Sequence, residues 1–117
     1  MPKALPLVDV SAPICCAPVA AAPMDEDAAL QVALRLKAIA DPVRVRLMSL
    51  LLANDELCTC DLAPSLGVSE ATVSHHLGVL RKAGLVTDGE RRGMNVWYAA
   101  RRDALTALCR VIDPSCC

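Results

Sequence analysis

The sequence has 117 residues, the length of one domain, and no apolar stretch long enough to cross a membrane. Apolar residues make up 55% of it, yet Trp97 and Tyr98 are the only aromatic ones, so an aliphatic, largely helical core is expected. The net charge of −1 hides an uneven distribution: residues 1–68 carry five Lys and Arg against eight Asp and Glu, whereas residues 69–102 carry six against three, so the positive charge is concentrated in the second segment.

The seven cysteines are an odd number, and Pro6, Asp9 and Pro13 interrupt the apolar residues near the N-terminus, so no secretory signal is expected. These observations favour a cytoplasmic protein whose reduced thiols serve as metal ligands over a framework of disulfides.

Residues 1–24 are rich in Ala, Pro and Val without a helical period, which predicts a flexible arm that carries Cys15 and Cys16. The acidic run at residues 25–27 then favours a helix start, and the helix is expected to reach about Ala40. Apolar residues spread around most of this helix, more than one buried face requires. The excess suggests a dimer contact.

Two further helices are expected before the turn at Gly67. Asp41 caps the first and Pro42 occupies its first position; this helix runs to about Leu52. Its buried residues are expected to be Val43, Leu47, Leu50 and Leu51, with Arg44 and Arg46 in solvent. The second runs from about Thr59 to Leu66, and Pro64 is expected to kink it or delay its start.

Residues 68–84, VSEATVSHHLGVLRKAG, predict a helix that Ser69 caps and Gly84 ends. Val73, Leu77 and Leu80 form its apolar face. The opposite face is slim and carries short hydrogen-bonding side chains, as a helix lying in the DNA major groove requires. Together with the preceding helix it forms a helix-turn-helix in which this second helix reads DNA.

The spacing of the apolar residues changes after Gly84 from a helical pattern to a strand pattern. Residues 85–90 and 94–99 predict a β-hairpin with a turn at Arg91, Arg92 and Gly93, that is, a basic wing. A last helix over residues 103–112 is expected to bury Leu105, Leu108 and Ile112, which closes a domain of residues 25–113. Residues 114–117 form a tail that ends in Cys116 and Cys117.

Over residues 30–112 the sequence resembles the ArsR/SmtB family of metal-responsive repressors, on the motifs DPVRxRL, ELCTCDLA and SEATVSHHL and a basic wing in this order. The resemblance implies a mainly α, α+β fold: a homodimeric winged helix-turn-helix of four helices, a hairpin and a fifth helix. It also implies binding to double-stranded operator DNA in the metal-free state and release when a toxic metal or metalloid binds. An enzyme is not expected.

Cys58 and Cys60 belong to the segment that resembles the family's metal box. On one continuous helix their side chains would point about 200° apart. They converge if Cys58 lies in an extended approach and Cys60 in the first helical turn, where the helix N-terminus favours thiolates. A soft metal needs more than two thiolates, and one pattern of the family supplies them from an N-terminal arm of the partner subunit, which Cys15 and Cys16 match. Residues 17–23 extend to about 20 Å, enough to cross a dimer seam.

Four thiols, Cys15, Cys16, Cys58 and Cys60, allow two kinds of site. Three thiolates in a pyramid suit As(III) or Sb(III), and four in a tetrahedron suit Cd(II), Pb(II) or Zn(II). The vicinal pair on the arm resembles arsenite sensors, so As(III) or Sb(III) is favoured as the inducer, with Cd(II) or Pb(II) as the alternative. Cys109 is expected to be buried, and the role of Cys116 and Cys117 stays open.

The DNA site is expected to be an imperfect palindrome, and two groups of residues are expected to contact it. Ser69, which caps the reading helix, is expected to contact the DNA, and Thr72, Ser74 and His75 would read bases. Phosphates would be bound by Arg81, Lys82, Arg91 and Arg92. Two other classes are weighed: a thiol enzyme, which the absence of a C-x-x-C motif disfavours, and a DNA-binding protein whose cysteines form a redox switch or a structural zinc site.

Overall fold

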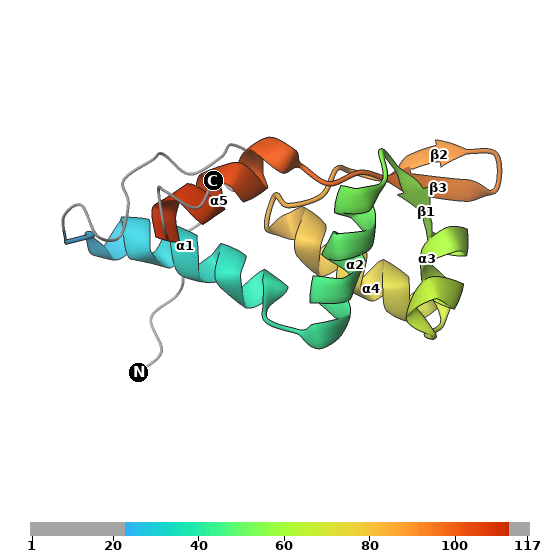
Figure 1. Cartoon of the computed structure of the whole chain (residues 1–117), viewed down its shortest axis with the longest axis horizontal. Helices are drawn as coiled ribbons and strands as arrows, with labels where there is room; N and C mark the ends of the chain where they lie inside the picture. The colour runs from blue at the N-terminus through green and yellow to red at the C-terminus, as the bar shows by residue number, and fades with distance from the viewer. Residues whose placement is uncertain (1–22, 113–117) are drawn as a thin grey trace.

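The computed structural model describes residues 23–112 of the chain. Cys15, Cys16, Cys116 and Cys117 lie outside these residues. The elements follow in the order α1 (Glu26–Ile39), α2 (Pro42–Ala53), β1 (Leu57–Cys58), α3 (Thr59–Leu66), α4 (Glu70–Lys82), β2 (Glu90–Arg92), β3 (Asn95–Tyr98) and α5 (Arg102–Ile112). The predicted mainly helical winged fold is therefore confirmed (Figure 1). Within the described part of the chain, no helix is both long and apolar enough to span a membrane.

Short polar side chains begin the helices where the sequence predicts. Asp25 accepts a hydrogen bond from the amide of Ala28 at the start of α1, and Ser69 accepts one from Thr72 at the start of α4. Asp41 accepts from the amides of Val43 and Arg44, with Pro42 at the first position of α2. These bonds satisfy amides that have no partner inside the helix, so each helix begins at its cap.

The core lies between α2, α3 and α4. Val73, Leu77 and Leu80 of α4 are fully buried, as predicted from their spacing. On α2, Leu47, Met48 and Leu51 are buried, whereas Val43 and Leu50 are only partly covered, so the buried face is rotated from the predicted one. The rotation leaves Arg44 half-buried against α4 rather than in solvent.

The turn between α3 and α4 forms as the sequence predicts. Gly67 adopts φ +69°, which a residue with a side chain rarely does, and so ends α3. The helix begins at Thr59 and runs through Pro64 to Leu66. Pro64 costs it one backbone hydrogen bond and falls on the exposed side.

The wing differs from the predicted hairpin. Arg91 and Arg92 are strand residues of β2, not turn residues, because Arg92 pairs with Asn95 and leaves Gly93 and Met94 to turn the chain. Gly93 supplies the φ of +65° at this turn. Leu85 and Val86 are buried in the core instead of extending the hairpin, apart from one bridge between Val86 and Ala100.

A third strand, not expected from the sequence, completes the sheet. β1 pairs antiparallel with β3, and the strand order is β1-β3-β2. Leu57 lies opposite Tyr98, and Cys58 lies opposite Trp97. The segment that leads into α3 is therefore hydrogen-bonded to the wing.

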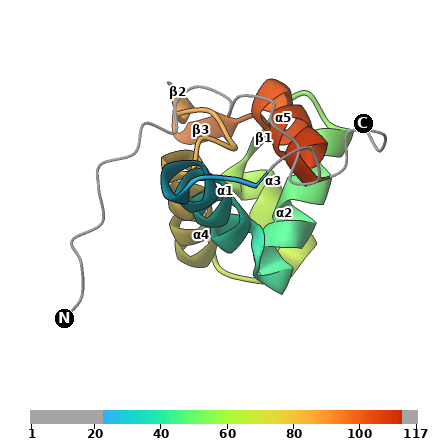
Figure 2. The ribbon, with the colours of Figure 1, turned by 90° about the vertical axis from the view of Figure 1, so that its left-hand side faces the viewer.

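α1 and α5 lie side by side at the end of the molecule opposite the sheet (Figures 1 and 2). Leu108 and Val111 of α5 pack against Val32 and Ile39 of α1. The buried face of α5 consists of Ala104, Leu108 and Val111, so the predicted burial of Ile112 is wrong: its side chain is 55% exposed.

Candidate functional site

The two cysteines of the predicted metal box converge at the junction of β1 and α3. Cys58 is the last residue of β1 and the N-cap of α3, with extended backbone angles of φ −89° and ψ 165°. Cys60 lies one residue inside the helix. Cys58 is fully buried and Cys60 is exposed, so one ligand is fixed by the core and the other faces solvent.

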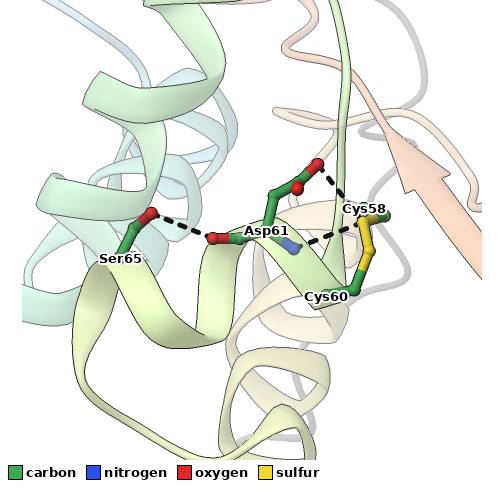
Figure 3. The surroundings of a disulfide bond; sticks show 4 residues. All are labelled: Cys58, Cys60, Asp61 and Ser65. Carbon is green, nitrogen blue, oxygen red and sulfur yellow. Dashed lines mark hydrogen bonds between the residues drawn. A yellow bond between two sulfur atoms is a disulfide. The ribbon is translucent and has the colours of Figure 1, made fainter.

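In the structure the two sulfur atoms form a disulfide (Figure 3). This differs from the expectation of reduced thiols, because the extended-to-helical change between these residues brings the two sulfurs within bonding reach. Reduction of this one bond yields two neighbouring thiols at a helix N-terminus, which stabilises thiolates.

Asp61 is a third donor that the sequence analysis missed. Its amide donates a hydrogen bond to Sγ of Cys58 at 3.2 Å, and its Oδ2 lies 3.3 Å from the same sulfur (Figure 3). Sγ of Cys58, Sγ of Cys60 and the carboxylate of Asp61 all lie within 4.8 Å of one another. Its position three residues after the N-cap Cys58 explains the amide contact, since a cap binds the amide two or three positions on, and the same position brings the carboxylate to the sulfur.

This donor set fits a soft or borderline ion bound at the surface. Two sulfurs and one carboxylate oxygen converge beside the exposed side of Cys60. A thiophilic ion prefers three or four thiolates, so it would need ligands beyond these three donors.

The reading helix α4 presents the predicted polar side chains. Ser69, Ser74 and His75 are exposed, and Thr72 is half-exposed. The hydroxyls of Ser69 and Thr72 lie 2.9 Å apart and Ser69 also caps the helix, so both hydroxyls are held in place. His76 turns inward, where its Nδ1 lies 3.1 Å from the guanidinium of Arg44 on α2.

The basic residues divide into two groups. Lys82 and Arg91 are exposed, and within residues 23–112 neither has an ion-pair partner. Arg81 lies 3.8 Å from Asp88, a distance at which an exposed pair contributes little.

Arg92, by contrast, is held by carboxylates. It forms a two-point contact with Glu56, and its Nη2 lies 2.8 Å from Glu90. The hydrogen bond to Glu56 is the main cause that raises the pKa of Arg92, and the bond to Glu90 adds to it. Conversely, Arg92 lowers the pKa of Glu90. The guanidinium also lies 5.6 Å from the ring centre of Trp97.

Cys109 lies on α5, far along the chain from β1, and is half-buried rather than buried as expected.

A family model described as "Bacterial regulatory protein, arsR family" matches residues 41–88, the span from α2 through α4. The cadmium resistance regulator CadC of Listeria innocua is 42% identical over 62 residues, covering 53% of this chain and 51% of CadC. The arsenic resistance regulator ArsR1 of Pseudomonas putida is 40% identical over 62 residues, covering 53% of this chain and 48% of ArsR1. The chain thus spans about half the length of these curated relatives.

Among solved structures, a homodimeric winged helix-turn-helix domain from Mycobacterium bovis, described as a possible ArsR-family regulator, superposes with a TM-score of 0.62. It is 31% identical, and the match covers 75% of this chain and 82% of that one.

Proposed function

Because the chain belongs to the ArsR family of bacterial regulatory proteins, we propose that it is a transcriptional repressor that binds operator DNA without metal and releases it when an ion binds. The observation that carries the proposal is the convergence of Cys58 and Cys60 at the start of α3, directly before the reading helix α4. Thiolates there bind thiophilic ions, which links ion binding to the part of the fold that would contact DNA.

The proposed inducer is As(III) or Sb(III), with Cd(II) or Pb(II) as the alternative. Relatives named for arsenic and for cadmium resistance are both similar to this chain at comparable identity, so the choice rests on the number of thiolates. Cys58 and Cys60 would supply two thiolates. The arm of the partner subunit would supply one more, from Cys15 or Cys16, to As(III) or Sb(III), and both to Cd(II) or Pb(II). Three thiolates favour As(III), and four favour Cd(II).

The proposed DNA contacts follow from the exposed surface of α4 and the wing. Thr72, Ser74 and His75 would reach base edges from α4, and Arg81, Lys82 and Arg91 would bind phosphates. In a homodimer the two α4 helices would enter successive major grooves of an imperfect palindrome. A coupling of about 1–3 kcal/mol between the ion site and DNA would weaken binding by one to two orders of magnitude.

The test is fluorescence anisotropy of the reduced protein on DNA from upstream of its own gene, titrated with arsenite and separately with Cd(II). The proposal expects one ion to release the DNA, and Cys58→Ser to abolish release without loss of metal-free binding. Serine suits this variant because its oxygen replaces the sulfur as the cap of α3. Cys109→Ser is the matched control and should keep release.

Other outcomes identify the rival functions. If DNA binds but neither ion releases it, the cysteines serve redox chemistry or structure, and the sensor proposal fails. Loss of folding on chelation would indicate structural zinc. Turnover of arsenate in a thiol-titration assay would indicate a thiol enzyme.

A further inference from the structure

Arg92 connects the wing to the segment that precedes the thiol site. It is the last residue of β2, whereas Glu56 directly precedes β1, 36 positions earlier in the chain. Nη2 of Arg92 lies 2.9 Å from Oε2 of Glu56, and Nη1 contacts the other carboxylate oxygen. A two-point contact of this kind fixes the relative orientation of the two groups.

The backbone makes a second connection between the same two regions. β1 contains only Leu57 and Cys58, and its pairing places Cys58 opposite Trp97. The ring of Trp97 lies beneath the guanidinium of Arg92. Cys58 is therefore both a strand residue beside the wing and a member of the thiol site. Because it is also buried in a packed environment, its backbone cannot shift without moving its strand partner.

The charges around Arg92 argue against a direct phosphate contact. One guanidinium lies between two carboxylates, those of Glu56 and Glu90, so the cluster carries a net charge of −1. A phosphate would have to displace one carboxylate while facing the other. Arg91, the neighbouring strand residue, is exposed and lacks such partners among residues 23–112.

We propose that Glu56 and Arg92 are positioning residues that transmit the state of the thiol site to the wing, and that Arg91 makes the wing's phosphate contact alone. This inference rests on the proposed sensor function. When Cys58 changes ligands, β1 moves, and the Glu56–Arg92 bridge moves β2 with it, which turns the wing away from the DNA. Glu90 bonds the same guanidinium from within β2, so it holds Arg92 without joining the two regions.

The first experiment compares wild type, Glu56→Gln and Glu90→Gln. Each reduced full-length protein is titrated on operator DNA with and without saturating arsenite, and with Cd(II) in a parallel series. Both variants remove one charge beside Arg92, but only Glu56→Gln weakens the bridge between the two regions, because an amide offers one acceptor oxygen and cannot make the two-point contact. We expect Glu56→Gln to reduce the ion-induced loss of DNA affinity at least threefold, and Glu90→Gln to leave that ratio within about twofold of wild type. Equal ratios in all three proteins would overturn the inference.

Trp97 supplies a readout that does not depend on DNA. As the single tryptophan, it reports on the wing when the protein alone is titrated with either ion. Glu56→Gln should give a smaller fluorescence change than wild type at the same half-saturating concentration, because the ion still binds. An unchanged amplitude would contradict transmission through the bridge. Wild type that binds neither ion would instead refute the proposed function itself.

A second pair of variants separates transmission from phosphate binding. Arg91→Gln should weaken metal-free DNA binding and reduce the dependence of log affinity on log salt by about two per dimer, one for each subunit. Arg92→Gln should leave that salt dependence unchanged and lower the ion-induced ratio instead. If Arg92→Gln reduces the salt dependence as Arg91→Gln does, Arg92 is a phosphate ligand and the inference is wrong.

Discussion

Asp41 shows how one side chain fixes a helix and makes its stability depend on pH. Its carboxylate accepts hydrogen bonds from the amides of Arg44 and Val43 at the start of α2. The amide of Arg44 is the main cause that lowers the pKa of Asp41 below its ordinary value of 3.8. A lowered pKa means that the folded protein binds the proton less well than the unfolded chain, so the cap stabilises the fold above pH 3.8 and loses this effect as the pH falls further.

We therefore expect Asp41→Ala to lower the Tm at pH 7 by several degrees, because α2 loses its cap. Asp41→Asn is the matched control, since the amide oxygen still caps the helix but does not titrate there. Thermal unfolding between pH 2.5 and 7 should show a smaller loss of Tm on acidification for Asp41→Asn than for wild type. Identical pH profiles for these two proteins would contradict the assignment.

Among the elements, α4 and the wing each contain or adjoin a glycine, and the two positions differ in the space available for a side chain. Gly78 lies within α4, and a Cβ added there would meet nothing within 4 Å. Gly89 directly precedes β2, and a Cβ added there would lie 2.9 Å from Cζ and Oη of Tyr98 and closer still to Val96. The first position tolerates a side chain in the free protein, whereas the second does not.

Gly78→Ala should stabilise the free protein by up to about 1 kcal/mol, because alanine loses less backbone entropy in a helix. Chemical denaturation measures this change. The same variant tests whether α4 must be slim on its DNA side: operator affinity should fall if the backbone at Gly78 approaches DNA closely. A loss of stability in Gly78→Ala would contradict the open space around this position.

Gly89→Ala should destabilise the wing by about 1–3 kcal/mol, since Val96 is β-branched and cannot easily move aside. We expect lower operator affinity and a changed Trp97 emission, while helical circular dichroism at 25 °C stays near that of wild type. Normal affinity and emission would show that the hairpin accommodates the methyl group without cost.

At the scale of the whole molecule, apolar side chains remain uncovered where α1 and α5 lie side by side. Leu36 of α1 is 39% exposed and Ile112 of α5 is 55% exposed, and only Ala38 and Arg35 of α1 are buried. α1 is thus apolar on more sides than its own core uses, as the sequence indicated. This surface is the proposed dimer contact, in line with the homodimeric relative.

Leu36→Glu should convert the dimer to a monomer, because a charge replaces an apolar contact at a symmetric interface and is placed there twice. Analytical ultracentrifugation measures the mass, and operator affinity should fall at least tenfold since two linked reading heads become one. Val45→Glu is the control: Val45 is 51% exposed on α2 and lies beside Arg46 and Ser65, and its variant should stay dimeric. A monomeric control or a dimeric Leu36→Glu would contradict this interface.

Local chemistry allowed the sequence to determine a large part of this protein. Capping residues and glycines affect the backbone only within a few residues. The starts of α1, α2 and α4 therefore followed from Asp25, Asp41 and Ser69, and the end of α3 followed from Gly67. The convergence of Cys58 and Cys60 is equally local, because it needs only a change from extended to helical backbone between them. The ligands proposed on the arm lie outside the described residues and stay predictions.

Contacts between residues far apart in the chain were decided by the tertiary structure alone. The pairing of Cys58 with Trp97 and the contact of Glu56 with Arg92 join segments that are nearly 40 residues apart, and no local pattern encodes them. Two arginines beside a glycine indicated a basic turn, yet strand pairing set the register and moved them into β2. The sequence therefore determined which helices form and where the thiols meet, while the packing of the chain decided that the thiol site adjoins the wing.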